Sequence, residues 1–505
     1  MFDKLKLFIN RLGKKMIAAT NNVIDVSDKR YIELKISAWK SSKRRQDQIK
    51  GDLYYKGAHD ILRRKRQVVG EGGELTEVDN LPNNKIVDNQ FGKMVDQKKN
   101  YLLGQPIAFN SENEQYNEAL RDVLGKRFMK TIKDVGQDSI TGGLAWLHPY
   151  YDENGQFKFK EFPAHEILPF WADKAHTELK MAVRYYLEEK EGVAHDDFVE
   201  RVEIYTPVGI FYYTLINNTL YPDAQTPHRN YLTVESEEGE LDYNWTRVPL
   251  VPFKFNSSEM PLLNRCKSIQ DAINKVMSDF VNGMEENAGG NSIIVLNNFD
   301  GENLGEFRKN LSQYRAVKIR STESAKGGVD TLTVEVNATN YELILKLLKR
   351  QLIENCRGFD AKDERMAGNP NQMNIQSMYT DIDLDAHDME TEYQASLDNL
   401  LWFVNQHLAN MGVGSFENED VDIVFNRDTL VNETEVMQML TSAGVRIPNK
   451  VLLEQVPFID DVDEAMDIVS VDIYSDRYIP QRYLEQASEE IEALYGLTAL
   501  VISPR

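Results

Sequence analysis

The most regular pattern of apolar positions in the chain lies between residues 375 and 411. Apolar or small residues recur there in steps of three, four and four, at positions 375, 378, 382, 386, 389, 393, 397, 400, 404, 408 and 411. This eleven-residue period, roughly 3.67 residues per turn, is close to the period of a straight α-helix. The pattern therefore predicts one unbroken helix, which at a rise of about 1.5 Å per residue would be about 55 Å long.

Two further helical patterns bracket a short insertion. The first begins near residue 260, and its apolar stripe is Ile269, Ile273, Val276, Phe280 and Met284. The second begins near residue 340. Between them, about 45 residues contain strand-like runs such as "SIIVLNN" and "VDTLTVEV" and one short helix. An insertion of this size seldom buries a core of its own, so we expect it to pack against another copy of the chain or a partner.

Alternating apolar and polar positions replace the helical pattern between residues 144 and 255. The run "LAWLHPYYDENGQFKFKEF" contains two alternating segments on either side of Asn154-Gly155, which is a strong hairpin signal. The runs "VEIYTPVGIFYYTL" and "RVPLVPFKF" continue in the same style. Together with the helices, they predict an α+β fold with a largely antiparallel sheet.

One more helix is predicted from residue 85 to residue 103. Its apolar stripe, with one lysine included, is Val87, Phe91, Met94, Lys98 and Leu102, and Gly104 and Pro106 end it. Up to about residue 80 the chain is helical and locally basic in pattern, and the C-terminal region from residue 431 has the pattern of short helices.

Composition limits the class of protein. The chain has 505 residues, more than one compact core usually holds, so we expect two or more domains. No run approaches the roughly 20 apolar residues that a membrane-spanning helix needs. Arg11, Lys14 and Lys15 stand where a signal peptide would have its apolar region. The sequence therefore predicts a soluble protein that is not secreted.

The net charge of −22 argues against a general nucleic-acid-binding protein, because neutralising phosphates requires clustered Lys and Arg side chains. It does not argue against DNA as a passing cargo. A surface along which DNA slides should not hold phosphates tightly, and an acidic surface satisfies that condition.

The sharpest candidate for metal chemistry is "DIDLDAHDMETE", residues 381–392. It places Asp at positions 1, 3 and 5 and Glu at position 12 of a calcium-binding loop, but Ala386 occupies position 6, where the sharp turn needs glycine. The apolar repeat of the long helix also continues through it. On a helix, Asp381, Asp385, Asp388 and Glu392 form one acidic stripe, so the pattern favours a solvated acidic face.

No other motif indicates catalysis or a cofactor. None of the eight histidines lies in HExxH, no cysteine pair has zinc-site spacing, and GxSxG is absent, so no metal or cofactor is predicted. A carboxylate-metal enzyme would require Asp381 or Asp385 to converge with His387, which a helical stripe makes difficult. A peripheral membrane scaffold would require lipid binding by the N-terminal apolar stripe, whose more common role is packing on protein; this stripe is Phe2, Leu5, Phe8, Ile9 and Leu12.

Several long segments resemble one known family in its own order. They are "NNKIVDNQFGKMVDQKKNYLLGQPIAF", "GGLAWLHPYYDENGQFKF", "RVPLVPF" and "NFDGENLGEFRKNLSQYRAVKI" followed by "GGVDTLTVEV". They are similar to portal proteins of tailed double-stranded-DNA phages of Gram-positive bacteria. The resemblance extends from about residue 50 to residue 465.

The resemblance implies a portal fold that assembles as a ring, typically a dodecamer, at one vertex of the capsid. It implies no enzymatic activity. Carried over segment by segment, the fold has an α/β wing with the N-terminal region (1–258), a stem helix (259–287), a small β-rich clip (288–336), a returning stem helix (337–360), a tunnel loop (361–374), a long spanning helix with a returning wing strand (375–430) and a helical crown (431–505).

The resemblance also implies partners and contact residues. DNA would enter and leave through the ring, and the partners would be the terminase large subunit, the head-completion adaptor, and the scaffolding and major capsid proteins, with no membrane. The protein would be assembled in the host cytoplasm and become part of the virion. In the tunnel loop, the residues expected to face DNA are Lys362, Arg365, Asn369, Asn371 and Gln372. In the clip, the basic residues that could meet DNA or a partner are Arg308, Lys309, Arg315, Lys318 and Arg320, and a solvated face is the alternative.

The two cysteines give a geometric expectation. Cys266 lies near the start of the first stem helix and Cys356 near the end of the second, almost equally far from the insertion. Because the two helices would be antiparallel, we expect the cysteines at a similar height, as free thiols.

Overall fold

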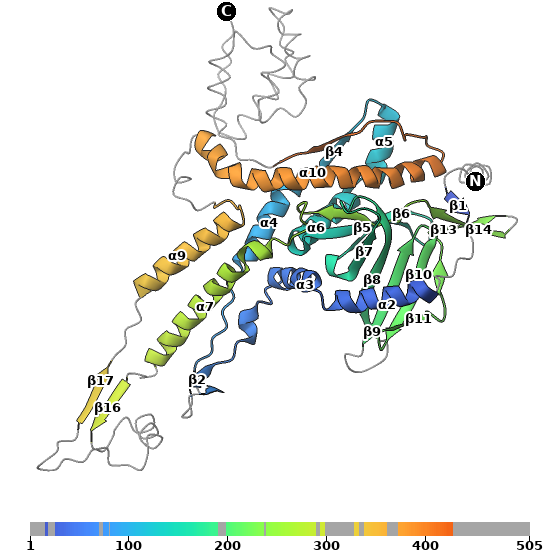
Figure 1. Cartoon of the computed structure of the whole chain (residues 1–505). Helices are drawn as coiled ribbons and strands as arrows, with labels where there is room; N and C mark the ends of the chain where they lie inside the picture. Colours follow the sequence, from blue (N-terminus) through green and yellow to red (C-terminus); the bar gives the residue numbers. More distant parts are fainter. Residues whose placement is uncertain are drawn as a thin grey trace, which may run out of the picture. The chain divides into compact units, whose positions relative to one another are not determined.

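Figure 1 shows a computed structural model of the whole chain. It describes residues 16–18, 26–69, 74–79, 81–189, 198–236, 239–288, 293–297, 328–332, 338–360 and 372–427. The chain divides into two compact units, one of Met1–Asp360 and Thr380–Asp428 and the other of Ala361–Tyr379 and Thr429–Arg505. The elements described here belong to the first unit, apart from the first turns of the longest helix.

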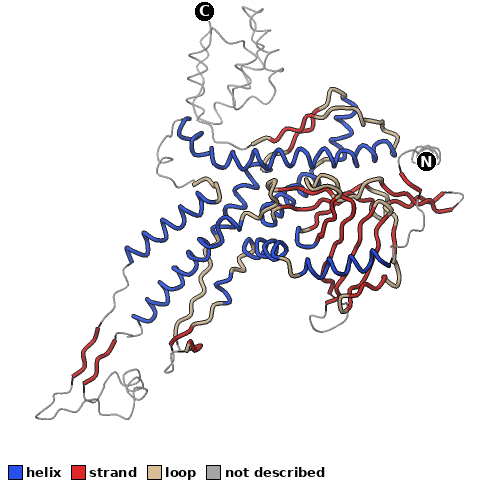
Figure 2. The backbone as a smooth tube through the Cα atoms, viewed as in Figure 1, coloured by secondary structure: helices blue, strands red, loops and turns tan. Residues whose placement is uncertain are grey.

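The described residues form helices and antiparallel sheets, which confirms the predicted α+β class (Figures 1 and 2). The largest sheet has six strands in the order β11-β10-β9-β8-β7, with β12 paired to β10. Its strands are β7 (Ile167–Trp171), β8 (Leu179–Glu189), β9 (Phe198–Thr206), β10 (Gly209–Ile216), β11 (Thr219–Pro222) and β12 (His228–Arg229).

Helix α2 (Val26–Lys40) covers one face of this sheet (Figure 1). Ile32, Ile36 and Trp39 are buried in a cluster with the apolar side chains of that face, among them Val183 and Ile204. Because successive side chains of a strand point to opposite faces, the alternation in the sequence leaves the polar residues on the other face.

A second sheet, in the order β15-β5-β6, contains the hairpin predicted around Asn154-Gly155. Its strands are β5 (Leu144–Tyr151), β6 (Phe157–Phe162) and β15 (Val251–Lys254). The turn closes with a 3.0 Å hydrogen bond from the Asp152 N–H to the Gln156 carbonyl. Gly155 has φ +70°, a left-handed conformation that glycine adopts without a steric penalty. The hairpin prediction is confirmed.

The long helix is also confirmed. Helix α10 (Gln372–Asn410) is continuous, and the predicted stripe is buried at Ile382, Ala386, Met389, Tyr393, Leu397, Leu400, Val404 and Leu408. After it, β18 (Asp422–Phe425) pairs antiparallel with β4 (Ile107–Asn110).

The two helices expected around the insertion are α7 (Leu263–Ala288) and α9 (Ala338–Asn355). Within the insertion, β16 (Ile293–Asn297) and β17 (Gly328–Leu332) form an antiparallel pair. The predicted helix at 85–103 is wrong at its start, because α4 (Gln90–Leu103) begins five residues later. Residues before it run extended beside α7, for a reason given below.

The remaining elements complete the first unit. They are β1 (Met16–Ala18), α3 (Lys43–Tyr55), η1 (Asp60–Arg63), β2 (Gln67–Val69), β3 (Leu75–Glu77), α5 (Glu114–Val123), α6 (Lys126–Gly142), η2 (Ala164–Glu166), β13 (Leu232–Ser236) and β14 (Gly239–Trp245).

Candidate functional site

The paired helices α7 and α9 pack through apolar side chains. The rings of Phe280 and Tyr341 lie with their centroids 4.9 Å apart, and Ile273 and Leu352 have no exposed surface. The centre of the predicted stripe on α7 is thus confirmed. Its end is not covered, since Met284 is 52% exposed.

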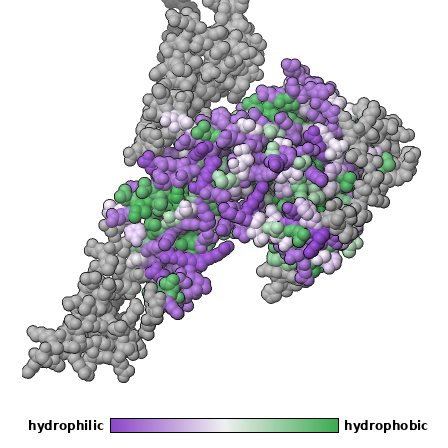
Figure 3. All heavy atoms as spheres, in the orientation of Figure 1, coloured by the Kyte–Doolittle hydropathy of each residue, from purple (hydrophilic) through white to green (hydrophobic). Residues whose placement is uncertain are grey.

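Helix α9 carries a second apolar face that the described part of the chain leaves exposed. Leu343, Ile344 and Leu347 are 67%, 46% and 57% exposed, and Figure 3 shows apolar surface over this helix. A surface helix of a monomer needs only one apolar stripe, directed at its own core. A second stripe on the same helix is typical of a contact with another molecule.

Helix α7 binds residues 84–91 through a row of buried polar side chains, which we call the polar ladder. The ladder consists of four side chains that lie four residues apart on the helix, each at most 1% exposed: Gln270, Asn274, Ser278 and Asn282. The hydrogen bonds run from the N–H of Asn84 to Asn282 (2.7 Å), of Ile86 to Ser278 (3.0 Å), of Asp88 to Asn274 (3.0 Å) and of Phe91 to Gln270 (2.9 Å).

The geometry of the polar ladder follows from two regular spacings. Two residues of an extended chain advance by about 6.6 Å. Four residues of an α-helix advance by about 6.0 Å. The alternate N–H groups of Asn84, Ile86 and Asp88 therefore meet every fourth side chain of the helix, and the fourth rung comes from Phe91, three residues further on in the first turn of α4. These bonds satisfy half-buried backbone donors of residues that pair with no strand, and Asn89 caps helix α4 at Gln90 by accepting a 2.8 Å hydrogen bond from the Gly92 N–H.

Four helical segments meet at one buried carboxylate, Asp385 of α10, which is 3% exposed. Lys98 of α4 lies 2.8 Å from it, Arg265 of α7 lies 2.7 Å from it, and Arg357, just after α9, lies 3.0 Å from it. Burial alone would raise the pKa of Asp385, but Lys98 and Arg265 outweigh it and hold the pKa below its usual value. The expectation of a solvated acidic stripe is wrong at this position, although Asp381 and Asp388 are exposed.

The end of α9 is shaped to bring Arg357 to Asp385. Arg357 has φ +48°, in the left-handed region that is uncommon for residues other than glycine. The Gly358 N–H donates to the Ile353 carbonyl at 2.9 Å, which closes the helix end. The Arg357 carbonyl also accepts a 2.9 Å hydrogen bond from Lys98. Arg357 lies four residues before the start of the tunnel loop expected from the sequence.

The two cysteines lie beside this junction, each next in sequence to one of its arginines. Cys266 and Cys356 are free and fully buried. Their side chains are close enough that Cys356, together with burial, raises the pKa of the Cys266 thiol. The expectation of two free thiols at a similar height is confirmed.

The comparisons with known proteins agree with one another. The family model described as "Phage portal protein, SPP1 Gp6-like" matches residues 35–477. The portal protein of Bacillus phage SPP1 is 27% identical over 421 residues, which are 83% of this chain and 82% of that protein. The portal protein of Clostridium phage phiCD119 is 29% identical over 434 residues, which are 84% of this chain and 91% of that protein. This chain belongs to the SPP1 Gp6-like phage portal family.

Membership of the portal family confirms the resemblance seen in the sequence. The function is that of a phage portal, which is a structural component of the virion and an oligomer at a vertex of the phage head. Both relatives belong to phages of Gram-positive hosts, as expected.

Most contact residues expected from the portal resemblance lie outside the described residues. This holds for Lys362, Arg365, Asn369 and Asn371 of the loop, and for Arg308, Lys309, Arg315, Lys318 and Arg320 of the insertion. Gln372 is the first residue of α10, and its backbone alone is described. The N-terminal apolar stripe at residues 2–12 also lies outside the described residues.

The described residues give no support to the calcium loop. Helix α10 continues through residues 381–392 without the turn that such a loop requires. No group of three or more His, Cys, Asp or Glu side chains within the described ranges could hold a metal ion. Among the helices that the structure describes, none combines the length and apolarity of a membrane span.

Sequence patterns missed both the polar ladder and the Asp385 junction. One signal for the junction was present: Lys98 occupies a position on an otherwise apolar stripe. A lysine there needs a buried acid, and Asp385 is that acid. The ladder had a spacing of four, but polar side chains at helical spacing usually indicate a solvated face.

Proposed function

We propose that copies of this portal protein form a closed ring, dodecameric as the family resemblance implies, around a channel for double-stranded DNA. The exposed apolar face of α9, formed by Leu343, Ile344 and Leu347, carries the proposal. We assign as its counterpart the end of α7, where Met284 is exposed. Because these two surfaces differ, the contact is heterologous, and heterologous contacts that close generate rings.

The test replaces apolar side chains of α9 with charges. Leu343→Glu with Leu347→Glu should convert the ring into monomers or open fragments, because each copy would bury two carboxylates in every contact. The native mass, measured by mass photometry, and negative-stain images report the outcome. Leu187→Glu, at a position on β8 that is 56% exposed, is the control. Full rings from the double variant would refute this contact.

Within this proposal the regions keep the boundaries inferred from the sequence. The wing is 1–258, the stem helices are 259–287 and 337–360, the clip is 288–336, the tunnel loop is 361–374, the spanning helix and returning strand are 375–430, and the crown is 431–505. The clip, with Arg308, Lys309, Arg315, Lys318 and Arg320, docks the terminase large subunit during packaging and the head-completion adaptor afterwards. Scaffolding and major capsid proteins surround the ring, which is assembled in the host cytoplasm.

The tunnel loop lines the narrowest part of the channel in this proposal, through Lys362, Arg365, Asn369, Asn371 and Gln372. The Asp385 junction supports this role, because it anchors the chain at Arg357, shortly before the loop. The portal itself hydrolyses nothing, and the energy for packaging comes from the motor.

A further inference from the structure

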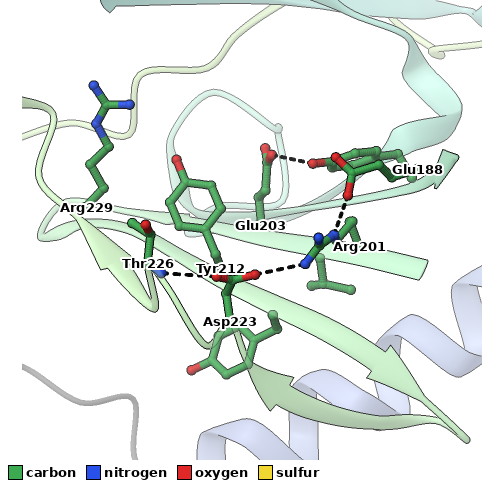
Figure 4. A pocket seen from close by; sticks show the side chains of 10 residues that line it. Glu188, Arg201, Glu203, Tyr212, Asp223, Thr226 and Arg229 are labelled. Atoms are coloured by element: carbon green, nitrogen blue, oxygen red, sulfur yellow. Dashed lines mark hydrogen bonds and ion pairs between the residues drawn. The ribbon is translucent and has the colours of Figure 1, made fainter. Parts of the chain in front are cut away.

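The polar face of the six-stranded sheet contains a hollow of about 310 Å³. It lies on the side of the sheet opposite α2, over strands β8, β9, β10 and β12, and its side chains are drawn in Figure 4. We call it the wing hollow. Tyr186 and Tyr212 give it aromatic walls, and arginines and carboxylates provide its charges.

Each carboxylate of the wing hollow already has its donors. Glu203, only 8% exposed, accepts hydrogen bonds from Tyr186 at 2.9 Å and Tyr205 at 2.7 Å, and Arg184 lies 3.3 Å away. Arg201 bridges the other two, lying 2.6 Å from Glu188 and 2.8 Å from Asp223. The hollow therefore has no acceptor in need of a cation.

Two donors of the wing hollow, by contrast, have no partner among the described residues. They are the exposed guanidinium of Arg229 and the half-buried hydroxyl of Tyr212, which extend from paired strands to the same side of the sheet (Figure 4). Burial, reinforced by the charge of Glu203, raises the pKa of Tyr212 to about 12. Its hydroxyl thus stays protonated at neutral pH and remains a donor.

We propose that the wing hollow binds the carboxylate of an acidic side chain presented by a partner protein, with Arg229 and Tyr212 as its donors. A guanidinium matches a carboxylate with two parallel hydrogen bonds. The tyrosine rings can pack against the aliphatic part of an acidic residue and its neighbours. Nucleic acid is disfavoured, because a chain of phosphates needs several cations, whereas Arg201 is already paired with Glu188 and Asp223 and Arg229 alone of the two lining arginines has no ion pair with a described residue.

The test uses two blocked tripeptides that differ in charge, acetyl-Leu-Glu-Leu-amide and acetyl-Leu-Gln-Leu-amide, with the full-length protein. Binding is measured by ligand-observed NMR. The glutamate peptide should bind at least tenfold more tightly than the glutamine peptide. Arg229→Ala should remove this preference, and Tyr212→Phe should weaken glutamate binding about threefold. Arg229 is exposed, so its substitution should leave the fold intact, and Arg63→Ala is the control at an exposed arginine outside the hollow.

Several outcomes would overturn the proposal. Equal affinities for the two peptides would do so, as would unchanged glutamate binding in Arg229→Ala or a complete lack of binding to the wild type. Inorganic phosphate that displaces the peptide at equal concentration would indicate a general anion site. A single-stranded oligonucleotide that displaces it would indicate nucleic-acid binding instead.

Discussion

Asp138 of α6 and Glu161 of β6 form a hydrogen-bonded pair of carboxyl groups, so one of the two carries a proton. Burial and the charge of Asp138 raise the pKa of Glu161 to about 9, from an ordinary value of 4.5. Asp134 adds to this effect and Lys130 opposes it. Unfolding releases the proton at neutral pH, so this pair should make the protein less stable as the pH rises from about 4.5 to about 9.

Glu161→Gln should remove this pH dependence, because the amide can donate to Asp138 without losing a proton. We expect the variant to melt about 3 °C higher than the wild type at pH 8.5. The two proteins should melt alike below about pH 4, where the wild-type Glu161 is mostly protonated in both the folded and the unfolded chain. Thermal unfolding across this pH range is the measurement. Glu153→Gln, in the exposed turn of the same hairpin, is the control. Parallel pH profiles for wild type and Glu161→Gln would contradict the shared proton.

At the scale of single elements, the sequence predicted what local periodicity determines. The hairpin at Asn154-Gly155 and helix α10 are both found where they were expected. The start of α4 was predicted five residues too early. The N–H groups of residues 84, 86 and 88 donate to side chains of α7, almost 200 residues away in sequence, and not to carbonyl groups of a helix. Local propensity carries no information about such a partner. Asp385 was misjudged for the same reason, since its three cations come from three other segments.

Removing one rung of the polar ladder should loosen residues 84–91 without unfolding the protein. Asn274→Ala deletes the acceptor for the Asp88 N–H and the contact with His59 at 2.7 Å. A lost buried hydrogen bond costs about 1–3 kcal/mol, so amide exchange in this segment should become at least about fivefold faster. Hydrogen exchange followed by mass spectrometry checks this, with the exposed neighbour Lys275→Ala as the control. Exchange unchanged from that of the wild type would mean that apolar packing, and not the ladder, holds the segment.

At the scale of the whole molecule, the family could be recognised from long sequence segments, while the assembly could only be inferred. The apolar residues of α9 that we assign to the ring contact, such as Leu343, resemble core residues in sequence. Only the packing of α7 against another face of α9 shows that they have no place in the core of the described residues. In the sequence, an apolar stripe that packs in the core of the chain has the same pattern as one that packs against another copy.

Reversing the charge of the tunnel loop should affect passage of DNA more than assembly. In Lys362→Glu with Arg365→Glu, rings of normal mass should form, because the loop lies outside the apolar face of α9. Packaging or retention of the genome should fall, since the loop would then repel phosphates. The DNA content of particles is the measurement, with Lys126→Glu and Arg127→Glu on the exposed start of α6 as the control. A failure of ring assembly would make the loop an oligomerisation element, and normal packaging would remove its role in the channel.

The polar ladder divides specificity unequally between its two sides. The helix contributes four particular side chains, whereas the segment at residues 84–91 contributes a backbone N–H group at each rung and one side chain, the Asn84 amide, which donates to Asn282 at 3.0 Å. Apart from Asn84, recognition therefore resides in the sequence of α7. In the segment, proline is the one residue type that removes a backbone N–H group, so its side chains other than that of Asn84 can change during evolution, whereas the four side chains of the helix cannot.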